Sequence, residues 1–165
     1  MSSEAHRSDA PKSVRCFVLT ISDSRTDASD TSGAAIVELL TGAGQVIVGR
    51  KIVKDDPAMV RGAVKSMEGS ADVIITTGGT GITGRDSTYE SIVGLLNKQL
   101  NGFGELFRML SYEEIGSAAM LTRACAGTIG RTAIFSLPGS EHAVRLAMTK
   151  LILPELGHVV RELRR

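Results

Sequence analysis

The chain of 165 residues lacks any apolar run approaching the ~18 residues that a membrane span requires, which excludes an integral membrane protein. An excess of one charge is also missing, because 19 Lys and Arg stand against 18 Asp and Glu. Nucleic-acid-binding proteins usually carry a basic excess, so no nucleic acid is expected as a partner. The two cysteines, Cys16 and Cys125, fit neither a metal-binding spacing nor a disulfide framework. We expect buried free thiols in a reducing cytoplasm.

Neither internal repeats nor a linker interrupts the sequence, and 42% of its residues are apolar. A chain of this length can bury a core as one domain. Residues 1–13 are polar and lack the apolar stretch of a signal peptide. We expect residues 1–13 to form a flexible leader and residues 14–165 to form a single domain in the cytoplasm.

Strands alternate with helices along this domain. Runs of apolar and β-branched residues predict strands over residues 14–21, 45–53, 71–77, 127–129 and 132–137. Helical spacing of apolar residues predicts helices over residues 33–42, 57–67, 88–100, 103–110 and 112–124, and a C-terminal helix kinked at Pro154. This alternation predicts an α/β fold, a three-layer sandwich with a mostly parallel central sheet.

Two helix starts carry capping signals. Asp56 directly precedes Pro57, which is typical of an N-cap followed by the first helical position. Ser87 and Glu90 have the spacing of a capping box. Asp56 is better placed to cap than Asp55, so we expect Asp55 to point into a cleft, although capping remains an alternative for both.

Polar or glycine-rich segments follow four of the predicted strands. They comprise residues 22–25, 54–56, 78–86 and 136–140. Ligands of parallel α/β sheets bind beyond the carboxyl ends of the strands, where such loops meet. The convergence of these four loops therefore predicts a binding site at one edge of the sheet.

The glycine loop, residues 78–86, matches two known patterns incompletely. Residues 79–84 fit the G-x-G-x-x-G pattern of dinucleotide-binding folds, but the acidic residue expected ~20 positions further on is missing from a strand end. The nearest candidate, Glu105, falls in a predicted helix. Residues 79–86 also resemble a Walker A loop, but Arg85 replaces its lysine and Asp86 its hydroxyl residue. A tight turn without a ligand is a third alternative.

The residue types of the glycine loop suit an anion. Backbone amides of glycines can approach an anion closely because no Cβ intervenes. The following helix would present the positive end of its dipole. The candidate amides and hydroxyls belong to Thr77, Gly78, Gly79, Thr80, Gly81, Ser87 and Thr88.

Asp86 is an acidic residue where a phosphate is expected, and its charge has no evident structural use. It suits a Mg²⁺ ligand, because Mg²⁺ takes one or two carboxylates together with phosphate oxygens, or else a partner for a substrate amide. Asp55 and Asp23 lie on neighbouring loops and are candidates to complete such a site. An Asx-turn is the alternative for Asp23.

Four motifs in one order resemble the MoaB/Mog family of molybdenum-cofactor biosynthesis proteins, which includes the N-terminal domain of gephyrin. They are the segments 22–33, 53–56, 76–88 and 136–140, and the resemblance extends from residue 14 to the C-terminus. Segments 103–108 and 113–119 look more like the MoaB branch than the Mog branch.

The resemblance implies a three-layer α/β fold that assembles as a homotrimer or, in the MoaB branch, a homohexamer. It implies molybdopterin as substrate, adenylylated with ATP and Mg²⁺ with release of pyrophosphate. Asp55 and Asp86 match the catalytic carboxylates and are the candidate Mg²⁺ ligands. The positions that match the substrate pocket are Ser22, Asp23, Thr77, Gly78, Gly79, Thr80, Gly81, Ser87, Thr88, Glu105, Ser136, Pro138, Gly139 and Ser140.

Two positions depart from the family's pattern. Gly84 replaces a residue that is often proline, which implies a more mobile loop, and Ser140 stands where several active members have asparagine. A non-catalytic molybdopterin-binding or scaffold protein of the same pathway is the main alternative function. A nucleotide-binding oxidoreductase is a third.

Overall fold

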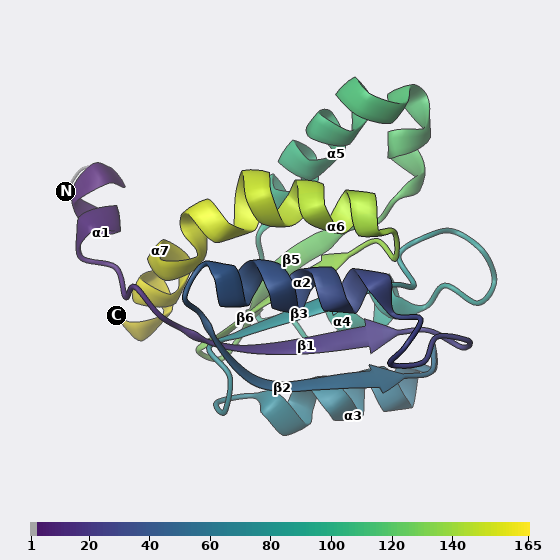
Figure 1. The fold of residues 1–165 in the computed structure, drawn as a ribbon, viewed down its shortest axis with the longest axis horizontal. Coiled ribbons are helices and arrows are strands. Elements are labelled where there is room, and N and C mark those ends of the chain that lie inside the picture. Colours follow the sequence, from purple (N-terminus) through teal and green to yellow (C-terminus); the bar gives the residue numbers. More distant parts are fainter. Residues whose placement is uncertain (1–2) are drawn as a thin grey trace.

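The computed structural model describes residues 3–165; Met1 and Ser2, the first residues of the predicted leader, lie outside the described residues. A six-stranded sheet in the order β2-β1-β3-β6-β5-β4 forms the middle layer (Figure 1). Four strands are parallel, β1 (Arg15–Ile21), β2 (Val46–Val53), β3 (Val73–Thr77) and β6 (Thr132–Leu137). Antiparallel pairing adds β5 (Cys125–Ile129) and β4 (Lys98–Gln99) at one edge. The predicted mostly parallel α/β fold is confirmed.

Helices cover both faces of the sheet, each over its own hydrophobic cluster (Figure 1). One face is covered by α2 (Thr31–Gly42), α5 (Asn101–Ile115), α6 (Glu141–Ala147) and α7 (Leu153–Arg164). The opposite face is covered by α3 (Pro57–Met67) and α4 (Thr88–Val93). The central strand β3 contributes Val73 and Ile75 to the first cluster and Ile74 to the second, which explains why that strand is apolar throughout.

The helix predicted over residues 88–100 is too long. Helix α4 ends at Val93, and Lys98–Gln99 instead pairs with β5 as a short strand. Leu96 packs against the cluster of one face and Leu100 against the cluster of the other, whereas one face of a continuous helix would have carried both. Pairing with a distant strand therefore outweighed the local helical spacing.

The two helices predicted over residues 103–110 and 112–124 are one helix, α5, followed by a 3₁₀ helix at Gly116–Leu121. Gly116 ends the α-helix with a φ of 69°, a value that glycine adopts without steric cost.

Strand β5 begins at Cys125, two residues before the predicted start. Before Pro154, a π-helical segment at Met148–Ile152 interrupts the C-terminal helix, because proline has no N–H to continue the regular bonding.

The short helix α1 (Ser3–Ser8) lies beside the C-terminal helix α7 (Figure 1). Arg7 forms an ion pair with Glu155, and Arg161 lies 3.3 Å from the Asp9 carboxylate. The flexibility of the leader stays a prediction. Within residues 3–165, no helix has both the length and the apolar character needed to cross a membrane.

A buried carboxylate fixes the start of α2. Asp30 is 1% exposed; its Oδ1 accepts a hydrogen bond from Gly33 N at 3.0 Å, and its Oδ2 from Thr20 Oγ1 at 2.6 Å and Arg50 Nη2 at 2.9 Å. Burial alone would raise the pKa of Asp30, but these bonds outweigh it and hold the pKa below its ordinary value of 3.8. The ionised form is therefore the one that stabilises the fold.

Replacing Asp30 by asparagine is expected to lower the free energy of unfolding by about 1.5–3 kcal/mol at neutral pH, because charge-assisted hydrogen bonds are lost. Since the folded pKa is the lower one, the contribution is complete above the unfolded value of 3.8 and disappears as the pH falls through the folded value. Urea unfolding of both proteins from pH 7 downwards checks this. A difference that grows below pH 3.8 would contradict it.

Candidate functional site

The carboxyl ends of the four parallel strands meet at one edge of the sheet. Ile21 of β1 pairs with Val53 of β2, and Thr77 of β3 pairs with Leu137 of β6. All four loops predicted to converge therefore leave the sheet from the same edge. The geometry of each candidate residue follows from this arrangement.

The first two glycines of the glycine loop occupy positions that no other residue fits. Gly78 has a φ of 107°, and a Cβ there would lie 2.1 Å from the carbonyl oxygen of Ile21. Gly79 has a φ of 69°, and its Cβ would lie 2.0 Å from Thr88 Oγ1. The loop thus passes directly between the end of β1 and the start of α4, which is the reason for glycine at both positions.

Asp55 packs against the glycine loop. It is 9% exposed, and its Oδ1 accepts hydrogen bonds from Ser87 Oγ at 2.7 Å and Ser87 N at 3.4 Å. Its Oδ2 lies 2.7 Å from the place that a Cβ on Gly79 would take. Asp56 caps α3 by accepting from Met59 N at 3.0 Å, as predicted, so Asp55 points inward and does not cap.

Ser87 does not form the predicted capping box. It is the N-cap residue of α4, but its side chain makes no bond to that helix and bonds to Asp55 instead. Its neighbour Thr88 is fully buried, and Thr88 Oγ1 has no hydrogen-bond partner among the described residues. A buried hydroxyl without a partner is costly unless something satisfies it, and this one lies against Gly79 of the loop.

Asp23, in the loop of residues 22–25 after β1, is hydrogen-bonded to the glycine loop and to the loop after β2. Its Oδ2 accepts from Arg85 Nε at 3.0 Å and Nη2 at 2.9 Å, and its Oδ1 accepts from Asp55 N at 3.2 Å. The hydrogen bond from Arg85 is the main reason that the pKa of Asp23 lies below its ordinary value. An Asx-turn would need Arg25 N to donate to the Asp23 carboxylate. Arg25 N donates to Ser22 Oγ instead, at 3.0 Å, so the Asx-turn alternative fails.

Asp86 has a structural use, contrary to the expectation from sequence. Its Oδ2 accepts from Thr83 N at 2.9 Å and Thr83 Oγ1 at 2.6 Å, which closes the loop on itself. A Cβ on Gly81 would lie 2.8 Å from the same oxygen, so glycine there lets the carboxylate approach. Oδ1 of Asp86 accepts no hydrogen bond from the described residues.

A cavity of about 430 Å³ opens beside the glycine loop. Of the predicted site residues, Gly79, Thr80, Gly81, Asp86, Pro138 and Gly139 line it. Ser136 is fully buried in the sheet and accepts from Thr76 Oγ1 at 3.0 Å. Ser140 caps α6 by accepting from Ala143 N at 3.2 Å. The Ser136 and Ser140 hydroxyls are therefore engaged with the protein itself.

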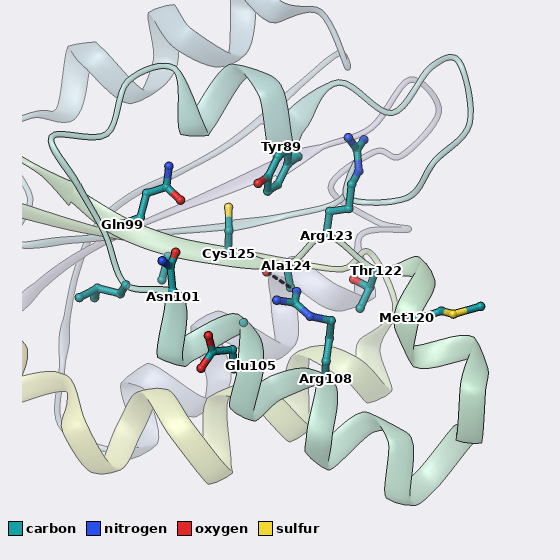
Figure 2. A pocket seen from close by; sticks show the side chains of 13 residues that line it. Tyr89, Gln99, Asn101, Glu105, Arg108, Met120, Thr122, Arg123, Ala124 and Cys125 are labelled. Carbon is teal, nitrogen blue, oxygen red and sulfur yellow. Dashed lines mark hydrogen bonds between the residues drawn. The ribbon is translucent and has the colours of Figure 1, made fainter.

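Glu105 lies on a second cavity of about 420 Å³, between α5 and β5 (Figure 2). Figure 2 shows Glu105 and Arg108 projecting from α5 below Cys125, with Tyr89 and Arg123 above it. Thr122 lines both cavities, so they adjoin, but Glu105 is not among the residues that line the cavity beside the glycine loop.

Burial raises the pKa of Cys125 to about 11, which leaves it a protonated thiol at neutral pH.

Arg123 was not predicted from sequence as a site residue. Its Nε and Nη2 donate to the carbonyl oxygen of Gly81 at 3.0 and 2.7 Å, although 42 residues separate the two in the chain. No local pattern signals a contact of that range. The short polar segment Thr122-Arg123 before a strand carried no spacing that distinguishes a site residue from a surface one.

Asp55 and Asp86 are the candidate metal ligands, and each keeps one carboxylate oxygen without a hydrogen bond from residues 3–165. Those residues contain no group of three or more His, Cys, Asp or Glu placed to hold a metal ion. Mg²⁺ in proteins usually keeps several water ligands and is bound by one or two carboxylates together with substrate phosphates. The donor set thus suits a cation that arrives with a polyphosphate, and not a permanently bound ion.

Fold and site together define a mostly parallel α/β domain with a candidate ligand site at the carboxyl edge of its sheet. The family described as "Probable molybdopterin binding domain" matches residues 17–158. Molybdenum cofactor biosynthesis protein B of Bacillus anthracis is 55% identical, covering 100% of this chain and 99% of that protein.

Solved structures agree. A crystal structure of Molybdenum cofactor biosynthesis protein B is similar with a TM-score of 0.91 at 56% identity, covering 95% of this chain and 99% of that one. The tungsten cofactor synthesizing protein MoaB from Pyrococcus furiosus has a TM-score of 0.85 at 44% identity, covering 94% and 100%. The chain belongs to the MoaB/Mog family of molybdenum-cofactor biosynthesis proteins, which confirms the resemblance seen in the sequence.

Proposed function

We propose that this protein adenylylates molybdopterin with Mg-ATP and releases pyrophosphate. The observation that carries the proposal is the placement of two carboxylates, Asp55 and Asp86, against one glycine loop at the carboxyl edge of the sheet. Membership of a molybdopterin-binding family supplies the substrate class. We place the reaction in the cytoplasm, since both cysteines are free thiols.

In the reaction, a terminal phosphate oxygen of molybdopterin attacks the α-phosphorus of ATP. The new P–O bond forms as the bond to the bridging oxygen breaks, and the electron pair leaves with pyrophosphate. Such transfers depend mainly on positioning and on neutralising charge. Mg²⁺, bound with the nucleotide, would supply charge neutralisation between the phosphates and Asp55, Asp86 or both.

The residues of the chain have separate tasks in this proposal. The amides of Gly79 and Gly81, two residues that line the cavity, hold the attacking phosphate, and the buried Thr88 packs beneath Gly79. Ser87 orients Asp55, and Arg85 keeps Asp23 against the Asp55 backbone. Thr80, Pro138 and Gly139 form the walls of the cavity.

A second candidate function is binding of molybdopterin without turnover, as a scaffold of the same pathway. Its support is the hydrogen bonding of Asp86 to Thr83, which turns one carboxylate oxygen back onto its own loop. Pyrophosphate release separates the candidates. The transferase releases pyrophosphate from ATP only when molybdopterin is also present, whereas the scaffold binds molybdopterin and releases none.

The protein is also proposed to be a homo-oligomer, a trimer or a hexamer. Exposed apolar side chains gather on α5 and the 3₁₀ helix after it: Leu106, Met109, Tyr112, Ile115, Met120 and Leu121, each 47–77% exposed. Large apolar side chains exposed together on one helical segment are typical of an interface.

Light scattering at micromolar concentration is expected to give three or six times the monomer mass of 17.4 kDa. The double substitution Met109→Glu/Tyr112→Glu is expected to shift the mass towards the monomer, because it places charge in the apolar surface. Met59→Glu, which changes an exposed residue of α3 on the opposite face, serves as the matched control. A monomeric wild type would contradict the proposal.

A further inference from the structure

Arg123 joins the two ends of the exposed part of the glycine loop. Its Nε and Nη2 donate to Gly81 O, and the same Nη2 donates to Asp86 O at 3.3 Å. The Arg123 backbone N–H donates to Thr80 O at 2.9 Å. One residue, placed just before β5, thus binds three carbonyl groups of the loop.

The guanidinium of Arg123 is itself held by α4. It forms an ion pair with the Glu90 carboxylate, and its Cζ lies 5.1 Å from the centre of the Tyr89 ring (Figure 2). The hydrogen bond from Arg123 is the main reason that the pKa of Glu90 lies below its ordinary value. The ion pair fixes one edge of the guanidinium, and the aromatic ring lies against its flat face. Together they fix the direction in which the remaining N–H groups point.

The glycine loop depends on such an anchor because little else restrains it between Gly81 and Asp86. This stretch contains no helix or strand, and Ile82 at its outer side is 67% exposed. Apart from Arg123, the side-chain bonds of this stretch among the described residues run from Thr83 to Asp86 within the loop, and from the exposed Arg85 to Asp23 and to the carbonyl oxygen of Asp55. Asp86 ends the stretch, so its carboxylate moves whenever the loop moves.

We propose that Arg123 is a positioning residue that fixes the glycine loop, and through it the Asp86 carboxylate, in the geometry needed for catalysis. The inference rests on the proposed adenylyl transfer. Arg123 acts through backbone carbonyls, so its requirement is the two-pronged donor geometry of arginine and not positive charge alone. Lysine keeps the charge but has a single nitrogen, which cannot reproduce the paired Nε and Nη2 bonds to Gly81 O together with the Nη1 ion pair to Glu90.

The test compares Arg123→Lys with Arg15→Lys. Arg15 also donates through Nε and Nη2, to Asp72, but lies at the amino end of β1, away from the site. Amide hydrogen exchange is measured for residues 82–86 and, as an internal monitor, for β1. Arg123→Lys is expected to speed exchange in the loop by about 10-fold or more while β1 stays protected, and Arg15→Lys to leave the loop unchanged.

Kinetics then separate positioning from a general structural effect. Arg123→Lys is expected to lower kcat by about 10- to 100-fold with KM for ATP changed less than about twofold, because misplacement acts on the reacting geometry. Unchanged loop exchange, equal acceleration in β1, or unaltered kcat overturns the proposal. Faster loop exchange in a protein whose wild type transfers no adenylyl group supports the anchoring role and overturns only the proposed function.

Discussion

Replacing Asp86 by asparagine is expected to slow adenylyl transfer by about 10²- to 10³-fold, the usual effect of removing one charge-stabilising group from a reacting centre. The fold is expected to survive, because the asparagine side-chain oxygen can still accept from Thr83 N and Thr83 Oγ1, as Asp86 Oδ2 does. Only the negative charge and the second carboxylate oxygen are lost. Transfer rates and circular dichroism of the variant measure both effects.

Thr83→Val is the matched control for Asp86→Asn. It removes the hydroxyl bond to Asp86 but keeps the carboxylate, so it reports on the loop contact alone. Its rate is expected to stay within about 10-fold of wild type, the scale of losing one modest hydrogen bond. Full activity in Asp86→Asn would remove Asp86 from the catalytic residues.

Replacing Asp55 by asparagine is expected to raise the Mg²⁺ concentration needed for half-maximal activity by about 10-fold or more, at least the loss that follows from removing a group that only supports a metal ligand. One anionic oxygen is lost from a site with few protein ligands, while the bond from Ser87 Oγ is kept by the amide oxygen. Asp55→Ala has a further cost in stability, because Ser87 Oγ then loses its partner. Comparing the two variants separates the metal effect from the structural one.

Asp56→Ala is the matched control on the same loop. It removes the cap of α3 and is expected to lower stability by about 0.5–2 kcal/mol without altering the Mg²⁺ dependence. Mg²⁺ titrations and melting curves of the three variants provide the comparison. An unchanged Mg²⁺ requirement in Asp55→Asn, together with a lower melting temperature, would show that Asp55 is structural and that any metal is held elsewhere.

The parts of the fold that sequence predicted are those with local causes. Asp56 before Pro57 caps α3 as expected, and the uniformly apolar β3 lies at the centre of the sheet. Parallel order then brought the predicted loops to one edge. Elements shaped by distant partners were missed, such as β4, whose pairing with β5 ended a helix expected to reach Leu100.

Among the site residues too, those with local causes were predictable from the sequence and those placed by distant partners were not. Gly78 and Gly79 were predictable because a strand followed by glycines has a local meaning, and their positive φ angles agree. The bond from Ser87 to Asp55 spans 32 residues, and the one from Arg123 to Asp86 spans 37, so no short pattern encodes either. Glu105 came from family resemblance alone, and it lies on the neighbouring cavity.

Following the α-phosphate of ATP is the measurement that most directly tests the transferase proposal. Wild-type protein is incubated with molybdopterin, Mg²⁺ and ATP labelled at the α-phosphate, and the label is traced by chromatography. The proposal predicts label in adenylyl-molybdopterin, formed in equal amount to the pyrophosphate released and sharply reduced in Asp86→Asn. Molybdopterin that binds the protein but acquires no label would contradict the proposed function and leave a binding protein of the same pathway.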